Sequence, residues 1–336
     1  MIKVAVIGCG YWGPNLIRNF IICPDAELVW ICDLNKSRLE KVAMPYPSIK
    51  HTTNFNDILN DNTIKAVAIA TPVDKHFDIA KACLEKGKHI LIEKPLASNI
   101  SQGRELVNLA KKKKLKLMCD HTFCYTGAVR KMKEIIDSGE LGELLYFDSV
   151  RINLGLFQHD VNVVWDLAPH DLSILDFIIK ETPIQINTHG VCHAGNDLEN
   201  IAYVSIYYPD SFFAHLHLNW LSPVKIRKTV ICGREKMLVW DDLEPVEKIK
   251  IYDKGIEIKN LKHEQKNKMM FSYRSGDIYI PQLDNTEALF EVVREFIGCI
   301  RKNRKPLTDG ESGLRVLRLL EAAEKSIKSN GVNINV

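Results

Sequence analysis

The chain has 336 residues, a length that predicts two domains, each with a core of its own. Hydrophobic residues make up 46% of it and charged residues 26%, a globular balance that excludes disordered, collagen-like and fibrous chains. The formal net charge of +3 is too small to indicate a nucleic-acid partner or an acidic membrane surface, so an anionic ligand would need a local binding site.

The first 120 residues alternate short apolar runs with segments of helical period, which predicts a doubly wound parallel sheet covered by helices. The runs are almost continuously apolar, as expected of strands that are buried on both faces. The expected strands are residues 2–7, 27–32, 66–70, 89–93 and 116–119, with a weaker one at 49–52, and the expected helices are 14–22, 36–43, 75–86 and 101–114.

After residue 120 the pattern changes to longer segments in which apolar and polar residues alternate, which predicts a large, mostly antiparallel sheet. The expected strands are 144–154, 201–208, 213–221 and 227–232, and the expected helices are 128–137, 287–301 and 312–329. The sequence therefore predicts an α/β protein with a dinucleotide-binding domain at 1–120 and a substrate-binding and oligomerisation domain at 121–336.

The nine cysteines are scattered without a CxxC pair, and several lie in apolar runs. This pattern predicts reduced core thiols in a cytoplasmic protein rather than a disulfide framework or a zinc site. The chain begins directly with a strand-like run, and no apolar stretch reaches the roughly 18 residues that span a bilayer. We therefore expect neither a signal peptide nor a membrane partner.

A glycine-rich turn follows the first predicted strand, with the pattern GxGxxG at Gly8, Gly10 and Gly13. The first glycine permits a tight turn, the second lets the backbone approach a pyrophosphate, and the third allows close packing of helix on strand. The helix that begins here offers free N–H groups and its positive dipole end to an anion. We expect a Rossmann domain, with Tyr11 and Trp12 beside the nicotinamide.

Asp33 ends the second predicted strand, where a carboxylate can accept hydrogen bonds from the adenosine ribose. This favours NAD over NADP, because the carboxylate would repel a 2′-phosphate. Arg38 and Lys36 lie close enough to leave partial use of NADP open.

Glu93, Lys94 and Pro95 follow one another at the carboxyl end of the fifth strand, the edge at which open α/β sheets bind ligands. Glu93 can hold the ammonium group of Lys94 by a charge-assisted hydrogen bond, and Pro95 can fix the backbone. Lys94 could donate a hydrogen bond to a substrate hydroxyl or accept its proton.

With these motifs the chain resembles the Gfo/Idh/MocA family of sugar and polyol oxidoreductases. The resemblance also covers Ala70-Thr71-Pro72, the later His76, and Asp166 with His170, in the family's order over nearly the whole length. It implies a Rossmann domain followed by an α/β domain with a large, mostly antiparallel sheet. It also implies that the residues around the glycine turn, Ala70–Pro72, His76, Glu93 and Lys94 contact the cofactor.

Asp166 and His170 lie four residues apart, on one face of an apolar helix that runs to about residue 179. In the purely structural interpretation, Asp166 caps this helix, Pro169 lies in its first turn, and the polar residues only satisfy backbone donors. The resemblance implies that both polar residues face the sugar, where His170 can take the alcohol proton and Asp166 can orient it. Whether Lys94 or His170 is the acid/base stays open. A metal would need a third ligand, and we expect none.

The residues from Asp120 to Tyr125 differ from those that many family members have at these positions, so their substrate contacts cannot be transferred to this chain. His121 and Tyr125 remain candidates for the substrate pocket. Further candidates for binding hydroxyls or a diphosphate are Arg151, Asn153 and Gln158.

The sequence thus predicts an NAD-dependent oxidoreductase that acts on a sugar ring carbon. The residues from Gly10 to Asn15 and from Trp165 to His170 resemble those of family branches that act on nucleotide-linked sugars, and this resemblance implies reaction at C3 of a nucleotide sugar such as UDP-N-acetylglucosamine. A free polyol or aldose is the alternative substrate, and a non-catalytic NAD-binding sensor or scaffold is the alternative class. The alternation at 213–220 places His215, His217 and Asn219 on one polar sheet face that could pair with a second subunit. Proteins of the family that the chain resembles are commonly dimers or tetramers, so the resemblance implies a homodimer or homotetramer.

Overall fold

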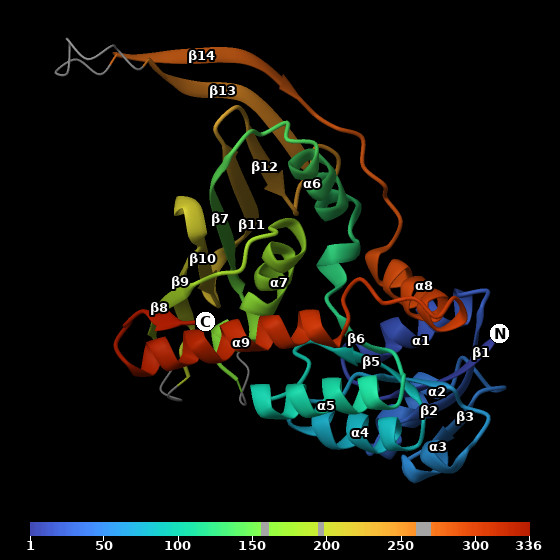
Figure 1. The fold of residues 1–336 in the computed structure, drawn as a ribbon. Coiled ribbons are helices and arrows are strands. Elements are labelled where there is room, and N and C mark those ends of the chain that lie inside the picture. The colour runs from blue at the N-terminus through green and yellow to red at the C-terminus, as the bar shows by residue number, and fades with distance from the viewer. Residues whose placement is uncertain (156–160, 194–197, 260–269) are drawn as a thin grey trace. The chain divides into compact units, whose positions relative to one another are not determined.

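The computed structural model describes residues 1–155, 161–193, 198–259 and 270–336 (Figure 1). Its contacts divide the chain into two units. The first combines Met1–Thr126 with Asn285–Glu321, and the second combines Gly127–Asp284 with Ala322–Val336.

A six-stranded parallel sheet forms the centre of the first unit, in the order β3-β2-β1-β4-β5-β6. The strands are β1 (Ile2–Ile7), β2 (Ala26–Cys32), β3 (Lys50–Thr52), β4 (Ala66–Ile69), β5 (His89–Glu93) and β6 (Leu117–Asp120). The helices are α1 (Gly13–Ile22), α2 (Lys36–Ala43), α3 (Asn56–Asn60), α4 (Val73–Glu85), α5 (Ile100–Lys112), the 3-10 helix η1 (Thr122–Tyr125), α8 (Ala288–Arg301) and α9 (Gly310–Lys328), whose last residues belong to the second unit. The inner strands β4, β5 and β6 are almost entirely buried, whereas the edge strand β3 is largely exposed.

Residues 285–321 belong to the first unit, although the sequence assigned the whole of 121–336 to the second domain. Helix α8 packs against α1 and η1, and Arg18 on α1 makes two hydrogen bonds to Glu287, at 2.6 and 2.8 Å. The Thr308 backbone also accepts a hydrogen bond from the Cys119 N–H at 2.9 Å. These contacts join segments far apart in the sequence, which a reading of local pattern does not detect.

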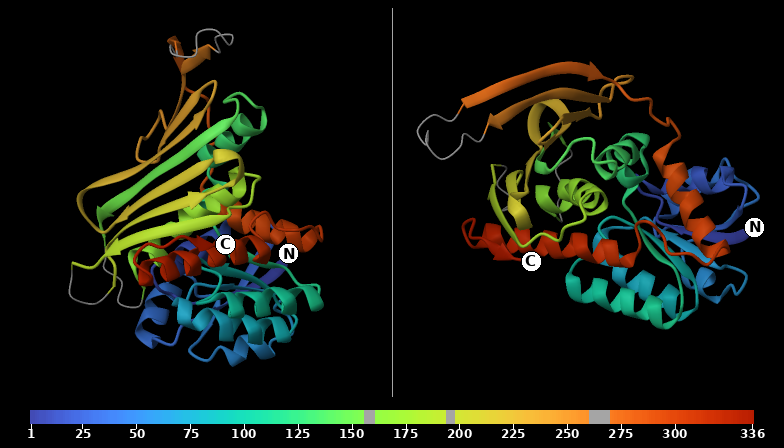
Figure 2. Two further views of the ribbon diagram at one scale, coloured as in Figure 1. Left: turned by 60° about the vertical axis from the view of Figure 1, so that its left-hand side comes forward. Right: turned by 45° about the horizontal axis from the view of Figure 1, so that its top comes forward.

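A nine-stranded sheet forms the second unit, in the order β14-β13-β12-β11-β7-β10-β9-β8-β15, with the β7–β10 pair parallel and the others antiparallel (Figure 2). The predicted fold class, a Rossmann sheet followed by a mostly antiparallel one, is confirmed. The strands are β7 (Leu144–Leu154), β8 (Gln185–Val191), β9 (Ile201–Tyr207), β10 (Phe213–Asn219), β11 (Leu221–Gly233), β12 (Met237–Asp241), β13 (Ile249–Lys259), β14 (Met270–Tyr279) and β15 (Ile334–Asn335), and the helices are α6 (Gly127–Asp137), α7 (Val163–Ile178) and the 3-10 helix η2 (Pro209–Ser211).

Helix α7 packs against β9, β10 and α6, so it covers one face of this sheet. On the other face, the ring of Tyr203 stacks on His217 with the ring centroids 4.5 Å apart. His215 Nδ1 lies 3.1 Å from Asp148 Oδ1 beside them. This face is polar and half-exposed, as the alternation in β10 predicted.

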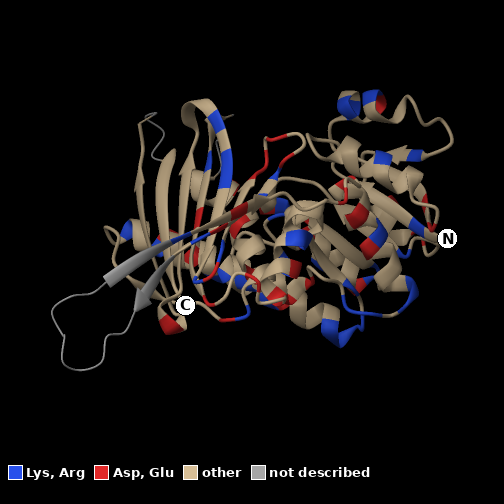
Figure 3. Ribbon diagram, turned by 90° about the horizontal axis from the view of Figure 1, so that it is seen from above, with Lys and Arg blue, Asp and Glu red and all other residues tan. Residues whose placement is uncertain are grey.

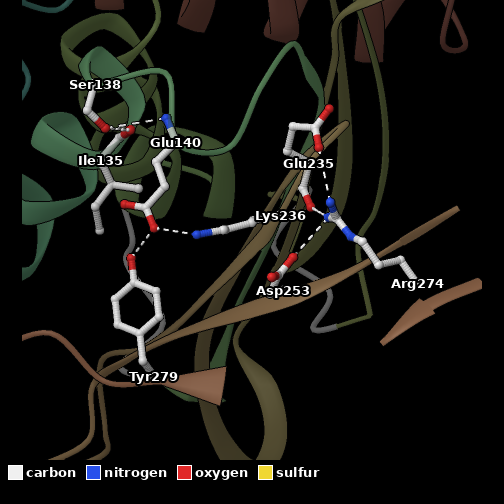
Figure 4. A network of polar contacts seen from close by, with 8 residues as sticks. All are labelled: Ile135, Ser138, Glu140, Glu235, Lys236, Asp253, Arg274 and Tyr279. Carbon is white, nitrogen blue, oxygen red and sulfur yellow. Dashed lines mark hydrogen bonds and ion pairs between the residues drawn. The ribbon is translucent and has the colours of Figure 1, made fainter. Parts of the chain in front are cut away.

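Polar contacts tie the β12–β14 end of the sheet to the segment after α6 (Figure 4). Glu140 accepts hydrogen bonds from Lys236, at 2.9 Å, and from the Tyr279 hydroxyl. Burial and the adjoining Glu140 raise the pKa of Tyr279 to about 12, so the phenol stays protonated and can donate. Arg274 pairs with Glu235 and with Asp253, at 3.1 and 3.0 Å.

Figure 3 shows both basic and acidic residues spread over many elements, with short runs of one sign such as Lys111–Lys114. This distribution accords with the small net charge of +3. Among the residues the structure describes, no helix is both long and apolar enough to cross a membrane.

Candidate functional site

The glycine turn after β1 has three glycines with different surroundings. Gly8 has φ +101°, and a Cβ there would lie 2.3 Å from the Ala70 carbonyl oxygen, so a side chain is excluded on both counts. A Cβ on Gly13 would lie 2.2 Å from the Gly8 carbonyl oxygen. A Cβ on Gly10 would meet no atom within 4 Å. Gly8 and Gly13 therefore serve the fold, and Gly10 leaves space for a ligand.

The N-terminus of α1 opens directly onto this turn. Its cap residue Trp12 makes no side-chain hydrogen bond to the first helical N–H groups, and a proline follows at the start of the helix. Tyr11 and Trp12 are 81% and 42% exposed, and their rings meet edge to face at 5.4 Å. An uncapped helix start with exposed aromatic rings beside it suits an anionic group that carries a flat ring.

The carboxylate of Asp33 braces the turn from the end of β2. Its Oδ2 accepts the Cys9 N–H and its Oδ1 accepts the Asn35 N–H, both at 2.7 Å. Arg38, half-exposed, lies 3.6 Å from Oδ2. The negative charge of Asp33 was the reason to favour NAD. Arg38, whose guanidinium could admit a 2′-phosphate, lies next to that charge.

The loop after β4 carries Ala70, Thr71 and Pro72 to the same edge of the sheet. The Thr71 hydroxyl is buried and has no hydrogen-bond partner among the described residues. An orphaned buried hydroxyl beside an open glycine is what a site for a polar ligand requires. The residues present thus fit a dinucleotide, with Gly10 and the α1 N-terminus for the phosphates and Asp33 for the ribose.

His76 on α4 connects this loop to the next one. Its Nε2 lies 2.9 Å from the Thr71 carbonyl oxygen, and its Nδ1 lies 2.9 Å from the Pro95 carbonyl oxygen. Burial lowers the pKa of His76, although a neutral ring can donate to just one of the two carbonyls. Only one of these two contacts can therefore be a hydrogen bond.

The Glu93-Lys94-Pro95 segment leaves β5 with a cis bond between Lys94 and Pro95. Glu93 is a register partner of Asp120 at the end of β6. His121 follows, with 2% of its surface exposed and its Nε2 buried without a partner among the described residues. Burial, with the charge of Lys94 nearby, lowers the pKa of His121 to about 3, so the ring is neutral.

Tyr125, the last residue of η1, is also buried. Its hydroxyl lies 3.0 Å from Thr308 Oγ1, which itself donates to the Cys119 carbonyl at 2.7 Å. Thr308 is a contact that the sequence analysis missed, because it lies almost two hundred residues further along the chain. The predicted role of Tyr125 in substrate binding has no support from these contacts and stays a prediction.

In the second unit, α7 carries Asp166 and His170 on one face, both half-buried. The prediction that Asp166 caps this helix is wrong. Asn162 is the cap, and its Oδ1 accepts the N–H groups of Val164 and Trp165 at 3.1 Å. Asp166 is therefore released for another contact, and its Oδ2 accepts the Trp220 indole N–H at 3.1 Å.

The earlier start of α7 also corrects the position of Pro169. The helix begins at Val163, so Pro169 lies inside it and beyond the first turn. The overlooked signal was Asn162 itself, because asparagine just before an apolar run is a favoured helix N-cap.

Arg151 on β7 is 3% exposed and pairs with Asp171, which is fully buried. Its Nε and Nη2 lie 2.8 and 3.0 Å from the two carboxylate oxygens, and Ser149 donates to the same carboxylate at 3.0 Å. The sequence analysis did not single out Asp171. Asn153 is half-buried on the same strand, and Gln158 lies outside the described residues.

The part of the chain that the structure describes holds no group of three or more His, Cys, Asp or Glu side chains placed to bind a metal ion.

The predicted site residues form two sets. Those of the first unit gather at the carboxyl ends of β1, β2, β4, β5 and β6, and Asp166 and His170 share a helix face in the second.

Two family models match the chain. One, described as an oxidoreductase family with an NAD-binding Rossmann fold, covers residues 2–121, and the other, the GFO/IDH/MocA C-terminal domain, covers residues 129–239. The NAD-binding domain predicted from the glycine turn is thereby confirmed.

Curated relatives include an uncharacterized oxidoreductase of Escherichia coli, YdgJ, which is 32% identical over 50% of this chain and 51% of its own length. A scyllo-inositol 2-dehydrogenase (NAD(+)) of Bacillus subtilis is 28% identical over 56% of this chain and 57% of its own length. The chain thus spans about half the length of the curated relatives it matches.

Among solved structures, the UDP-N-acetylglucosamine 3-dehydrogenase GnnA of Acidithiobacillus ferrooxidans superposes with a TM-score of 0.82. The two chains are 21% identical, and the match covers 98% of each. At this identity the likeness establishes the shared fold.

Proposed function

Because the chain belongs to the GFO/IDH/MocA family of oxidoreductases, we propose that it is an NAD-dependent enzyme that moves a hydride between an alcohol carbon of a sugar or polyol and the nicotinamide. The observation that carries the proposal is the convergence of the open Gly10, the orphaned Thr71 hydroxyl and Lys94 at one edge of a single sheet. Bound NAD supplies the hydride acceptor in such a reaction.

The proton of the reacting alcohol is transferred by residues of the chain. Lys94 holds the reacting hydroxyl by a hydrogen bond or accepts its proton. His170 is the second candidate for the acid/base, since imidazole titrates near neutral pH. Asp166, four residues before it on α7, orients His170 or binds an adjacent hydroxyl.

For the substrate we propose a nucleotide-linked sugar that reacts at C3, with UDP-N-acetylglucosamine as the first compound to test. The residues from Gly10 to Asn15 and from Trp165 to His170 support this choice, because they resemble those of family branches that act on nucleotide-linked sugars. The structural likeness to a dehydrogenase of that sugar covers 98% of the chain. A free polyol is the second candidate, favoured by the relative named for scyllo-inositol.

The test is a substrate panel followed by the absorbance of reduced nicotinamide. UDP-, dTDP- and GDP-sugars are compared with free inositol and glucose in the presence of NAD, and the corresponding keto-sugars are offered with NADH. Turnover with one nucleotide sugar supports the proposal, and turnover with a free polyol alone supports the second candidate. Calorimetric binding of NADH without turnover in either direction contradicts an enzymatic function and favours a sensor or scaffold.

We propose further that the protein acts in the cytoplasm as a homodimer or homotetramer, with the polar face of β9 and β10 as the contact. The stacked Tyr203 and His217 on that face support this choice, because ordered aromatic and imidazole rings on an open sheet suit contact with another surface. Light scattering that gives the 38.3 kDa monomer at working concentration would contradict it.

A further inference from the structure

Two acidic side chains lie next to each other inside the first unit. Glu93 ends β5 and Asp120 ends β6, and the two are register partners in neighbouring parallel strands (Figure 1). They are 8% and 1% exposed. Two carboxyl groups this close and this buried cannot both be ionised without a large repulsion.

The hydrogen bonds of Asp120 show where a proton must be. Its Oδ1 accepts from the Thr122 hydroxyl at 2.7 Å. Its Oδ2 is buried, and no described group donates to it. The carboxyl of Glu93 is within hydrogen-bonding reach of Asp120, and it becomes a donor when it carries a proton. One proton held between the two carboxyls therefore satisfies the orphaned oxygen and removes the repulsion.

The charges around the pair fit this assignment. Burial and the neighbouring carboxyl raise the pKa of Glu93 well above its usual range, and burial raises the pKa of Asp120 to about 6. Burial keeps the other titratable neighbours neutral, because it raises the pKa of Cys119 and lowers those of His121 and His76.

Lys94 is the cation that faces the pair. Its charge favours the ionised form of Glu93, and its backbone N–H donates to the Glu93 carboxyl. The pair therefore contacts the backbone of the residue whose side chain we assign to the reacting hydroxyl.

We propose that Glu93 and Asp120 act as one unit that holds a single proton at neutral pH, and that the one negative charge left on this unit positions Lys94. Both are positioning residues, since they act through Lys94 and not on the substrate. The role assigned to Lys94 rests on the proposed function, whereas the shared proton does not, so the experiments measure the pair and the lysine in protein without substrate.

The first experiment is infrared spectroscopy at pH 8, where the carbonyl stretch of a protonated carboxylic acid is separate from the carboxylate bands. The wild-type protein is expected to show one protonated acid. Glu93→Gln and Asp120→Asn should each abolish it, because a single carboxyl beside Lys94 ionises. Glu295→Gln is the matched control, since Arg304 holds that carboxyl as an anion, with its pKa lowered, and its loss leaves the signal unchanged.

Absence of the protonated acid in the wild-type protein would overturn the proposal, and this result needs no variant to fold. Persistence of the signal at full strength in both single variants would overturn it too, because the proton would then belong to another group.

The second experiment measures how fast a trace of acetic anhydride modifies Lys94 at pH 8, read from the mass of its peptide. Each single variant keeps one negative charge, so its rate should stay close to that of the wild type. The double variant Glu93→Gln/Asp120→Asn loses the charge that holds the ammonium group in place, so we expect a rate about tenfold higher or more. An unchanged rate in the double variant would refute the positioning of Lys94, whatever the enzyme assay shows.

Discussion

Alanine substitutions in the glycine turn should separate the glycines that the fold needs from the one that a ligand needs. At Gly8 an alanine meets the Ala70 carbonyl at 2.3 Å and must adopt φ +101°. The left-handed backbone alone costs roughly 1–2 kcal/mol, and the steric contact adds to it. At roughly 2–4 °C per kcal/mol, Gly8→Ala should lower the melting temperature by about 4 °C or more.

Gly10→Ala should behave in the opposite way. Its Cβ meets no atom within 4 Å, so the free energy of unfolding should change by no more than about 0.5 kcal/mol. The added methyl group occupies the space left for the pyrophosphate, and the affinity for NADH should fall about tenfold or more, equivalent to about 1.4 kcal/mol.

Scanning calorimetry gives the stability of both variants, and isothermal titration calorimetry gives their affinity for NADH. Wild-type affinity in a folded Gly10→Ala protein would refute the assignment of this turn to the dinucleotide. Unaltered stability of Gly8→Ala would refute the steric account of the turn.

Three further predictions concern other parts of the two units. Lys94→Ala and His170→Ala should each lower kcat while NADH still binds, and the acid/base is the residue whose loss costs about 10²–10⁴-fold; full turnover of either variant would exclude that residue. His121 has a folded pKa of about 3, below its unfolded value, so its contribution to stability is present above about pH 6.5 and is lost as the pH falls toward 3. His121→Gln should therefore remove up to about 3 kcal/mol of acid destabilisation between pH 7 and 4, measured by urea unfolding; identical pH dependence in both proteins would contradict a buried neutral ring. Asp171→Asn should destabilise the protein by about 3–5 kcal/mol, because it removes the carboxylate that forms the buried ion pair with Arg151, and a change below about 1 kcal/mol in the same urea assay would show that water reaches the pair.

The first sheet could be predicted from the sequence because its strands are buried on both faces and therefore appear as short apolar runs. Strand β4 illustrates this, with four buried residues in succession. Helix α3, five residues long, was missed, since a helix this short shows less than two turns of periodicity. In the second unit β8, β12, β13, β14 and β15 were not identified, although β12 is a short apolar run and β13 alternates apolar and polar residues.

The candidate site was predicted one motif at a time, and the sequence could not show how the motifs touch. Glu93 and Asp120 were both noted in the sequence, but their contact depends on the register of β5 against β6, which the sequence does not show. Arg151 was predicted to bind substrate because an arginine on a strand next to a site suits hydroxyls or phosphates. Its partner Asp171 lies on a helix, and a tertiary ion pair of this kind leaves no local pattern.

The contacts among the loops explain how Lys94 can be held in register with the glycine turn. Gly8 packs directly against the Ala70 carbonyl, and the following carbonyl, that of Thr71, is bound by one nitrogen of His76. The other nitrogen lies on the Pro95 carbonyl, one residue after Lys94. The loops after β1, β4 and β5 are therefore connected through short, buried contacts instead of moving independently. The hydride transfer that we propose requires the reacting atoms to be placed within a fraction of an ångström, and this connection would let the fold position the lysine before a substrate arrives.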